Sequence, residues 1–172
     1  MFDMIVATWH STSSNKVVSM ELHPDWEYVA DAVMGGVSQG RMSCEDYRGR
    51  KATVLRGNVS LDNNGGFIQI AFDLCPDGSA FDASAWNGIA LDLCGNGETY
   101  DIRLRTDPWQ SFRVSVTATE DWRTHIVPFE TVTPHRTDVA FDPSGLRRIG
   151  ILAIGREFHA EIAVAGVRLC RC

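Results

Sequence analysis

The chain has 172 residues, a mass of 19.0 kDa and a formal net charge of −6. A chain of this length with 44% hydrophobic and 22% charged residues has the composition of one globular domain, not of a disordered or collagen-like protein. The acidic balance argues against nucleic acid as the partner, because phosphate contacts need clustered positive charge. No run of about 20 apolar residues is present, so no membrane-spanning helix is predicted.

Short apolar stretches separated by Gly, Asn, Asp and Pro recur along the chain. In several of them apolar and polar residues alternate, which is typical of antiparallel strands with one buried face. The pattern predicts strands at 17–22, 41–44, 52–61, 67–74, 88–94, 99–106, 112–117, 123–128, 149–154 and 160–169, the last broken at Gly166. Helix signals amount to a turn or two in 24–32 and 81–85. The sequence therefore predicts an all-β protein, an antiparallel β-sandwich or jelly roll with few short helices, in a single domain spanning 1–172.

The cysteine and histidine patterns give no sign of a disulfide framework or a metal site. The five cysteines are odd in number and irregularly spaced, which indicates reduced thiols in a cytoplasmic protein. The five histidines lack metal-binding spacings, so no dedicated metal site is expected. Asp73, Asp77 and Asp82 could supply carboxylates to a structural calcium ion, although a solvated acidic loop is the simpler interpretation. No nucleotide-binding loop occurs, and no cofactor is expected.

One short motif resembles a hydrolase signature. The segment 36–40, GVSQG, matches the G-x-S-x-G pattern of a nucleophile elbow. That elbow requires a sharp strand-to-helix turn, whereas the residues after Gly40 suggest a strand, a polar turn and another strand. The sequence does not indicate which acidic residue and which histidine would complete a catalytic triad with Ser38. We interpret the segment as a glycine-rich turn, and we expect no catalytic residues and no enzyme activity.

Arginine supplies fourteen of the sixteen basic residues. Arg103, Arg105 and Arg113 alternate with apolar residues on two consecutive predicted strands, so they are predicted to share one sheet face that points away from the core. Such a stripe is either a solvated face or a partner-binding face, because guanidinium groups grip carboxylates in a planar, bidentate way.

The five tryptophans have two interpretations. Trp26 and Trp122 lie beside strand-like stretches, which favours packing in the core. Trp109 lies in a predicted turn, so it is the best candidate for a sugar-stacking side chain.

Two glycine-rich segments go beyond composition. They read WEYVADAVMGGVSQG at 26–40 and GNVSLDNNGGF at 57–67. Glycine pairs permit close approaches that a Cβ would block, and short polar side chains in loops bond to backbone groups. We therefore expect the two loops to meet, in a structural role or, alternatively, as a ligand or partner site at one end of the sandwich. The candidate residues are Trp26, Asp31, Met34, Gly35, Gly36, Ser38, Asn63, Asn64, Gly65 and Gly66.

In this order the two segments resemble the complex I intermediate-associated protein 30 family, whose pattern runs W…D-G-V-M-G-G-x-S and then F-x-G-x-V-S-L-E-N-N-G-G-F. Further similarity lies at 95–106, GNGETYDIRLRT, and at Trp122 followed by 127–129, VPF. The resemblance covers about 22–169. Ala32 and Asp62 depart from it, since the family usually has Gly and Glu there.

The resemblance implies a galactose-binding-domain-like jelly roll, with a family-like core at about 22–169 and an N-terminal extension at 1–16. Mitochondrial members act as chaperone-like assembly factors for the respiratory NADH:ubiquinone oxidoreductase. We therefore expect a non-catalytic binding module of the bacterial single-domain type. Its expected partners are subunits or assembly intermediates of a respiratory complex. Its expected location is the cytoplasm, with at most peripheral contact with the inner membrane. The alternative hypothesis is a carbohydrate-binding module that uses the concave jelly-roll face for a sugar ligand.

Overall fold

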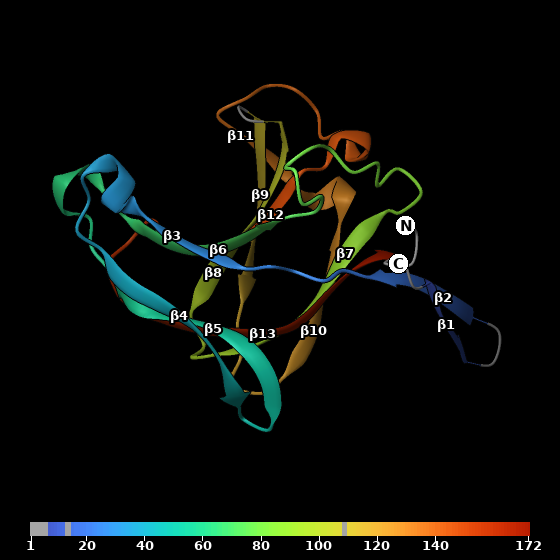
Figure 1. Cartoon of the computed structure of the whole chain (residues 1–172), viewed down its shortest axis with the longest axis horizontal. Coiled ribbons are helices and arrows are strands. Elements are labelled where there is room, and N and C mark those ends of the chain that lie inside the picture. The colour runs from blue at the N-terminus through green and yellow to red at the C-terminus, as the bar shows by residue number, and fades with distance from the viewer. Residues whose placement is uncertain (1–6, 13–14, 108–109) are drawn as a thin grey trace.

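Two antiparallel sheets form the molecule, as a computed structural model shows for residues 7–12, 15–107 and 110–172 (Figure 1). The helical content of these residues consists of four short 3-10 turns: η2 (Asp31–Met34), η3 (Asp62–Asn64), η4 (Phe129–Thr131) and η5 (Pro143–Gly145). The predicted all-β sandwich is confirmed. None of the helices in the described ranges is long and apolar enough to cross a membrane.

The seven-stranded sheet is organised around the long strand β13 (Phe158–Arg171). One edge of β13 pairs with β2 and β5, and the other edge pairs with β7. The register shifts between Val164 and Gly166, at the predicted interruption. The remaining strands are β1 (Ala7–Thr12), β2 (Asn15–Glu21), β4 (Gln39–Tyr47), β5 (Arg50–Val59), β7 (Gly88–Gly95) and β10 (Arg123–Pro128). In Figure 1 the β1–β2 hairpin, in blue, projects outward beside the C-terminal end of β13.

The six-stranded sheet has the order β11-β9-β8-β12-β6-β3. Its strands are β3 (Glu27–Ala30), β6 (Phe67–Asp73), β8 (Thr99–Asp107), β9 (Gln110–Thr117), β11 (Thr133–His135) and β12 (Arg148–Ile154). All of its neighbours are antiparallel. Because successive side chains of a strand point to opposite faces of the sheet, every second residue of these strands points into the core, and the residues between them point to the outer face.

The main core lies between the sheets and is filled by the apolar residues of that alternation. Ile68 and Ile70 of β6, Ile102 of β8, and Ile149 and Ile151 of β12 are all fully buried there. A second, smaller cluster lies on the outer side of the seven-stranded sheet, as the alternation in β5 and β13 requires. It comprises Tyr47, Ala52, Val54, Cys94 and Ala163, with Trp122 and Ala165 packed against them.

The two segments predicted to contain helical turns each match the structure only in part. Within 24–32, residues 27–30 form β3 and the turn η2 begins only at Asp31. Residues 81–85 contain a hydrogen-bonded turn at 84–85 but no helix, and Phe81 forms an isolated bridge with Leu146. The strands β1, β3 and β11 were not predicted. β3 and β11 are short, and each pairs along one edge of the sheet, so pairing with β6 and β9 defines them more than their own sequence does.

The expectation that all cysteines are reduced is wrong for one pair. Cys170 and Cys172 form a disulfide, whereas Cys44, Cys75 and Cys94 are free. Cys172 directly follows β13, and residues two apart in an extended chain project to the same side, which brings the two sulfur atoms within reach of each other.

The hydroxyl of Tyr100 links the two sheets inside the core. It donates to Asn96 Oδ1 (2.7 Å) and accepts from the backbone N–H of Glu161 (2.8 Å), which belongs to β13. We expect Tyr100→Phe to lower the free energy of unfolding by about 1–2 kcal/mol, because a partly buried acceptor and a partly buried donor lose their partner. Urea denaturation measures this difference, and an unchanged midpoint would contradict the link.

Candidate functional site

The carboxylate of Asp31 joins the two glycine-rich segments. It accepts hydrogen bonds from the backbone N–H of Ser38 (3.1 Å), the hydroxyl of Ser38 (2.5 Å), and the backbone N–H groups of Gly66 (2.6 Å) and Phe67 (3.3 Å). The Ser38 hydroxyl also accepts from the backbone N–H of Ser60 at 2.8 Å. The two loops therefore meet through the short polar side chain of Asp31. We call Asp31, Ser38 and their backbone partners the Asp31 clamp.

The Asp31 clamp lies where the chain crosses twice between the sheets. Asp31 follows β3 and Ser38 precedes β4, so the first segment leads from the six-stranded to the seven-stranded sheet. Ser60 follows β5 and Gly66 precedes β6, so the second segment leads back. One carboxylate therefore fixes both crossings at one end of the sandwich.

Asp31 is 0% exposed and stays ionised because of its hydrogen bonds. Burial by itself raises the pKa of a carboxyl group, but the donors on Ser38, Gly66 and Phe67 outweigh it and hold the pKa of Asp31 below its ordinary value. Burial and the negative charge of Asp31 in turn raise the pKa of Tyr28.

Two glycines of the motifs are required by the close packing around Asp31. A Cβ at Gly36 would lie less than 3.0 Å from three Asp31 atoms, and a Cβ at Gly65 would lie 2.5 Å from Asp31 Oδ2. Gly35 has a φ of 86° and Gly66 a φ of 137°, which side chains rarely adopt. These sequence-predicted residues therefore have a structural explanation, which favours the structural role for this pair of loops.

The other predicted motif residues lie around the clamp without entering it. Met34 ends η2 and Asn64 ends η3, and their side chains lie outside the described part of the structure. Asn63 is exposed with a φ of 58°.

Trp26 packs edge-on against Phe72, with 4.8 Å between ring centroids, as predicted for a core residue. The Ser38 hydroxyl is held by Asp31 and Ser60, and β4 begins at the next residue, so the G-x-S-x-G segment is a turn followed by a strand.

A second candidate site is the outer face of the six-stranded sheet. Registers align one residue from each of its six strands in a single row: Glu27, Ala71, Gly150, Arg103, Arg113 and Thr133. A parallel row brings Asp73, Arg148, Arg105, Ser111 and His135 together. We call the outer surface formed by Arg103, Arg105, Arg113 and Arg148 the arginine face.

The predicted arginine stripe does share one outer face, but its members differ in exposure. The Arg103 side chain is only 13% exposed and lies 3.5 Å from Asp101, and its Nε is buried with no hydrogen-bond partner. Arg113 is 45% exposed and lies 3.7 Å from the same carboxylate. Arg105 is exposed, and no carboxylate lies within 4.0 Å of its guanidinium among the side chains that the structure describes, which leave out Asp107. The idea of a fully solvated stripe is therefore wrong for Arg103, because Ile102 and Leu104 hold its strand in the centre of the sheet.

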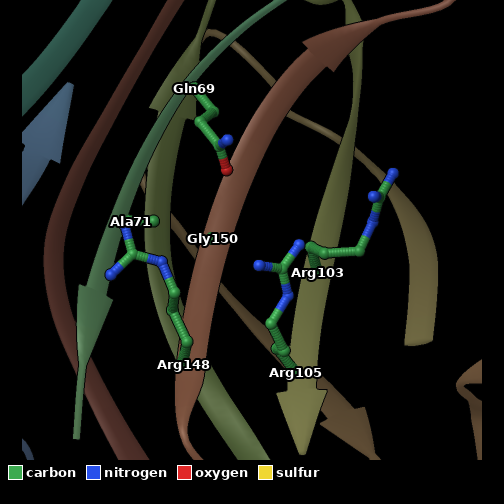
Figure 2. A pocket seen from close by; sticks show the side chains of 6 residues that line it. All are labelled: Gln69, Ala71, Arg103, Arg105, Arg148 and Gly150. Carbon is green, nitrogen blue, oxygen red and sulfur yellow. The ribbon is translucent and has the colours of Figure 1, made fainter. Parts of the chain in front are cut away.

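The arginine face has a hollow at its centre. Figure 2 shows the guanidinium groups of Arg148 and Arg105 and the amide of Gln69 around Ala71 and Gly150. The floor is low because Ala71 and Gly150 have little or no side chain. Arg148 pairs with Asp73 (2.8 Å) and with Glu27. The hollow continues past Arg105 toward Val29, Asp73 and Arg147.

Neighbouring guanidinium groups repel one another on part of the arginine face. Burial lowers the pKa of His135, and the charges of Arg103, Arg113 and Arg136 lower it further. Burial also lowers the pKa of Arg103, with Arg113 and Arg105 contributing repulsion against the attraction of Asp101. An anionic group placed in this hollow would relieve that repulsion.

Sequence reasoning missed several residues of this face. Gln69, Asp101 and Arg148 were not singled out. The available signal was that Gln69 and Asp101 each lie between two buried apolar residues and that Arg148 precedes the buried Ile149. Trp109, the predicted sugar-stacking residue, lies outside the described residues.

The acidic residues considered for calcium have other partners: Asp77 and Asp82 accept hydrogen bonds from the nearby Ser79 and Ser84. In the described ranges no group of three or more His, Cys, Asp or Glu side chains is arranged to hold a metal ion.

The sequence model of the complex I intermediate-associated protein 30 family matches residues 15–163. The chain belongs to this family. No functionally curated protein matches the sequence. The N-terminal boundary of the match includes β2 and so extends further than the family-like core expected from the motifs.

Solved carbohydrate-binding modules share the fold of this family member. A family 11 module from Clostridium thermocellum, in complex with a β-1,3-1,4-mixed-linked tetrasaccharide, superposes with a TM-score of 0.69 at 15% identity, covering 88% of this chain and 94% of that chain. A family 30 module of a Clostridium thermocellum cellulosomal cellulase gives a TM-score of 0.63 at 16% identity, covering 89% and 97%. At this identity the similarity shows the jelly-roll fold alone.

We expect Asp31→Asn to lower the free energy of unfolding by about 2–3 kcal/mol, because one acceptor oxygen becomes an amide donor that faces backbone N–H groups. Asp62→Asn, at an exposed position of the second loop, is the matched control and should be nearly neutral.

The pKa of Asp31 also predicts how the stability of the protein depends on pH. Since the folded-state pKa of Asp31 is depressed, its stabilisation is present above about pH 4 and is lost as the pH falls through the folded-state value. Acid titration of the melting temperature should show a smaller loss in Asp31→Asn than in the wild type.

Gly36→Ala tests the close packing of the Asp31 clamp. It should destabilise the protein by about 1–3 kcal/mol, as overpacking does. Gly145→Ala is the control, because its Cβ would lie an ordinary 3.6 Å from Thr106 O. In an Asp31→Ala background, Gly36→Ala should lower the free energy of unfolding by less than it does in the wild type, because the carboxylate that the new methyl group would contact is absent. Strict additivity in this double-mutant cycle would argue against the contact.

Proposed function

We propose that this chain is a non-catalytic binding module that assists assembly of the respiratory NADH:ubiquinone oxidoreductase, and that it recognises an acidic surface of a partner subunit through the arginine face. The proposed location is the cytoplasm, with at most peripheral contact with the inner membrane. Family membership supports the assembly role. The hollow around Arg105 supports the mode of recognition.

The observation that carries this proposal is the incomplete charge pairing of the arginine face. Asp101 is shared between Arg103 and Arg113, and no described carboxylate lies near Arg105. Guanidinium groups satisfy a carboxylate through two parallel hydrogen bonds, so an acidic side chain of a partner suits the hollow. Arginine stays protonated near neutral pH and does not act as a proton donor or acceptor in catalysis, which fits binding better than chemistry.

A sugar ligand is the second candidate, because solved modules with this fold are carbohydrate-binding modules. The hollow offers hydrogen-bonding groups on Gln69, Arg105 and Arg148. However, no aromatic side chain lines the described part of the hollow, and sugar-binding platforms depend on aromatic surface. The acidic protein surface is therefore the preferred partner.

The test compares binding of purified subunits and assembly intermediates of the respiratory enzyme to the wild type and to charge-reversed variants. Arg105→Glu with Arg113→Glu should weaken binding about tenfold or more, because reversed charges repel the partner carboxylates. Arg41→Glu, an exposed reversal on β4 of the other sheet, should leave binding unchanged. Wild-type binding should weaken strongly with salt, since the Debye length falls from about 10 Å at 0.1 M to about 3 Å at 1 M.

Surface plasmon resonance at several salt concentrations measures these effects, with melting temperatures as the check on folding. Binding that is indifferent to salt and to the reversed charges would contradict the proposal. Glycan-array binding that survives high salt and is lost in Trp109→Ala would favour the sugar ligand instead.

A further inference from the structure

We propose that Cys170 and Cys172 form a redox-active pair that exchanges its disulfide with a protein or peptide thiol. The two residues are two positions apart, with their Cα atoms at 5.6 Å, and they are joined in the structure. The pair lies on the seven-stranded sheet, whereas the arginine face lies on the six-stranded sheet. This activity is therefore separate from the binding function proposed above.

The two sulfur-bearing residues differ sharply in accessibility. Cys170 is 2% exposed within β13, whereas Cys172 is exposed just beyond this strand. Thiol–disulfide exchange requires an attacking thiolate to reach one sulfur atom in line with the S–S bond. The accessible target is Cys172, which makes the buried Cys170 the leaving group.

Hydrogen bonds hold the segment that contains the pair. The backbone N–H of Asn87 donates to Cys170 O (3.0 Å), and its side chain accepts from the Cys172 N–H (2.8 Å) and donates to Cys172 O (3.3 Å). Arg171 Nε donates to Ala85 O at 2.8 Å. Because the backbone is held on both sides of Arg171, the two sulfur atoms stay within reach of each other after the disulfide opens. That arrangement favours rapid re-formation of the disulfide.

A buried hydroxyl is available for the leaving thiolate. Ser19 of β2 lies directly opposite Cys170 in the register, so the two Cβ atoms share a face about 5 Å apart. Ser19 is 3% exposed, and its Oγ has no hydrogen-bond partner in the described structure. An unsatisfied buried hydroxyl is unfavourable, and a thiolate at Cys170 would accept its hydrogen bond. The open form of the pair thus satisfies a donor that the disulfide form leaves unpaired.

The exchange is a balanced two-electron reaction. A substrate thiolate attacks Cys172 Sγ, the Cys170–Cys172 bond breaks, and its electron pair leaves on Cys170 Sγ. A second substrate thiolate then attacks the substrate sulfur of the mixed disulfide, which forms the substrate disulfide and releases Cys172 as a thiolate. The two protons lost by the substrate thiols return to the two cysteines. Two substrate thiols are oxidised and one protein disulfide is reduced.

The test equilibrates the full chain, in a Cys44→Ser and Cys75→Ser background, with reduced and oxidised glutathione. Thiol alkylation and mass spectrometry then measure the state of Cys170 and Cys172. We expect a reversible transition between disulfide and dithiol across the glutathione ratios. In the Cys170→Ser variant, glutathione should accumulate as a mixed disulfide on Cys172, and in the Cys172→Ser variant the modification of Cys170 should be much slower.

Ser19→Ala tests the role of the buried hydroxyl. It should slow opening of the disulfide by glutathione about 2- to 10-fold, which is the effect expected from one hydrogen bond. Ser111→Ala is the matched control, because Ser111 Oγ is also buried and unpartnered but lies on the six-stranded sheet. The proposal would be overturned if Cys170 and Cys172 remained as free thiols in oxidised glutathione, or if excess reduced glutathione failed to open their disulfide. Equal rates in Ser19→Ala and the wild type would remove Ser19 from the mechanism.

Discussion

The buried carboxylate of Asp31 is the interaction on which the architecture depends. A jelly roll must pass its chain between two sheets, and each crossing leaves backbone N–H groups that no strand satisfies. Asp31 accepts three of these groups together with the Ser38 hydroxyl, and so ties the end of β3 to the start of β4 and the start of β6. The charge is tolerated in the interior because its hydrogen bonds replace the water it has lost. Gly36 and Gly65 are required there because any side chain would occupy the space of the carboxylate.

The arginine face depends on this anchoring through the strands that it fixes. β3 and β6 carry Glu27, Gln69 and Ala71 to one side of the hollow, and β8 and β12 carry the arginines to the other. Ala71 and Gly150 lower the floor, so the long guanidinium side chains reach over it instead of being displaced outward. The result is a recess lined by guanidinium groups on an acidic protein, with these groups held at fixed spacing by the sheet.

The two sheets thus carry different chemistry. The outer face of the six-stranded sheet presents the exposed Arg105, for which no carboxylate partner is described, and the half-exposed Arg113, which shares Asp101 with Arg103. Such partly paired guanidinium groups suit recognition. On the seven-stranded sheet, Arg50 and Arg168 are already paired with Asp92, and Arg56 with Glu45 and Glu161. Those networks cover the second apolar cluster around Tyr47 and Trp122, and their charges are satisfied internally. The disulfide of Cys170 and Cys172 lies beyond them along β13, where one sulfur is exposed and the other is buried.

The sequence by itself determined the fold class, most strands and the family, because period-two alternation reports burial directly and the two glycine-rich motifs are distinctive. It also predicted that Arg103, Arg105 and Arg113 share one face, since side-chain direction follows from strand periodicity. The tertiary structure alone decided which strands are neighbours. That pairing placed Arg148 and Gln69 beside Arg105, buried Arg103 against Asp101, and set the orphan hydroxyl of Ser19 opposite Cys170. Strand order and register arise from contacts between residues far apart in the chain, and no local pattern encodes them.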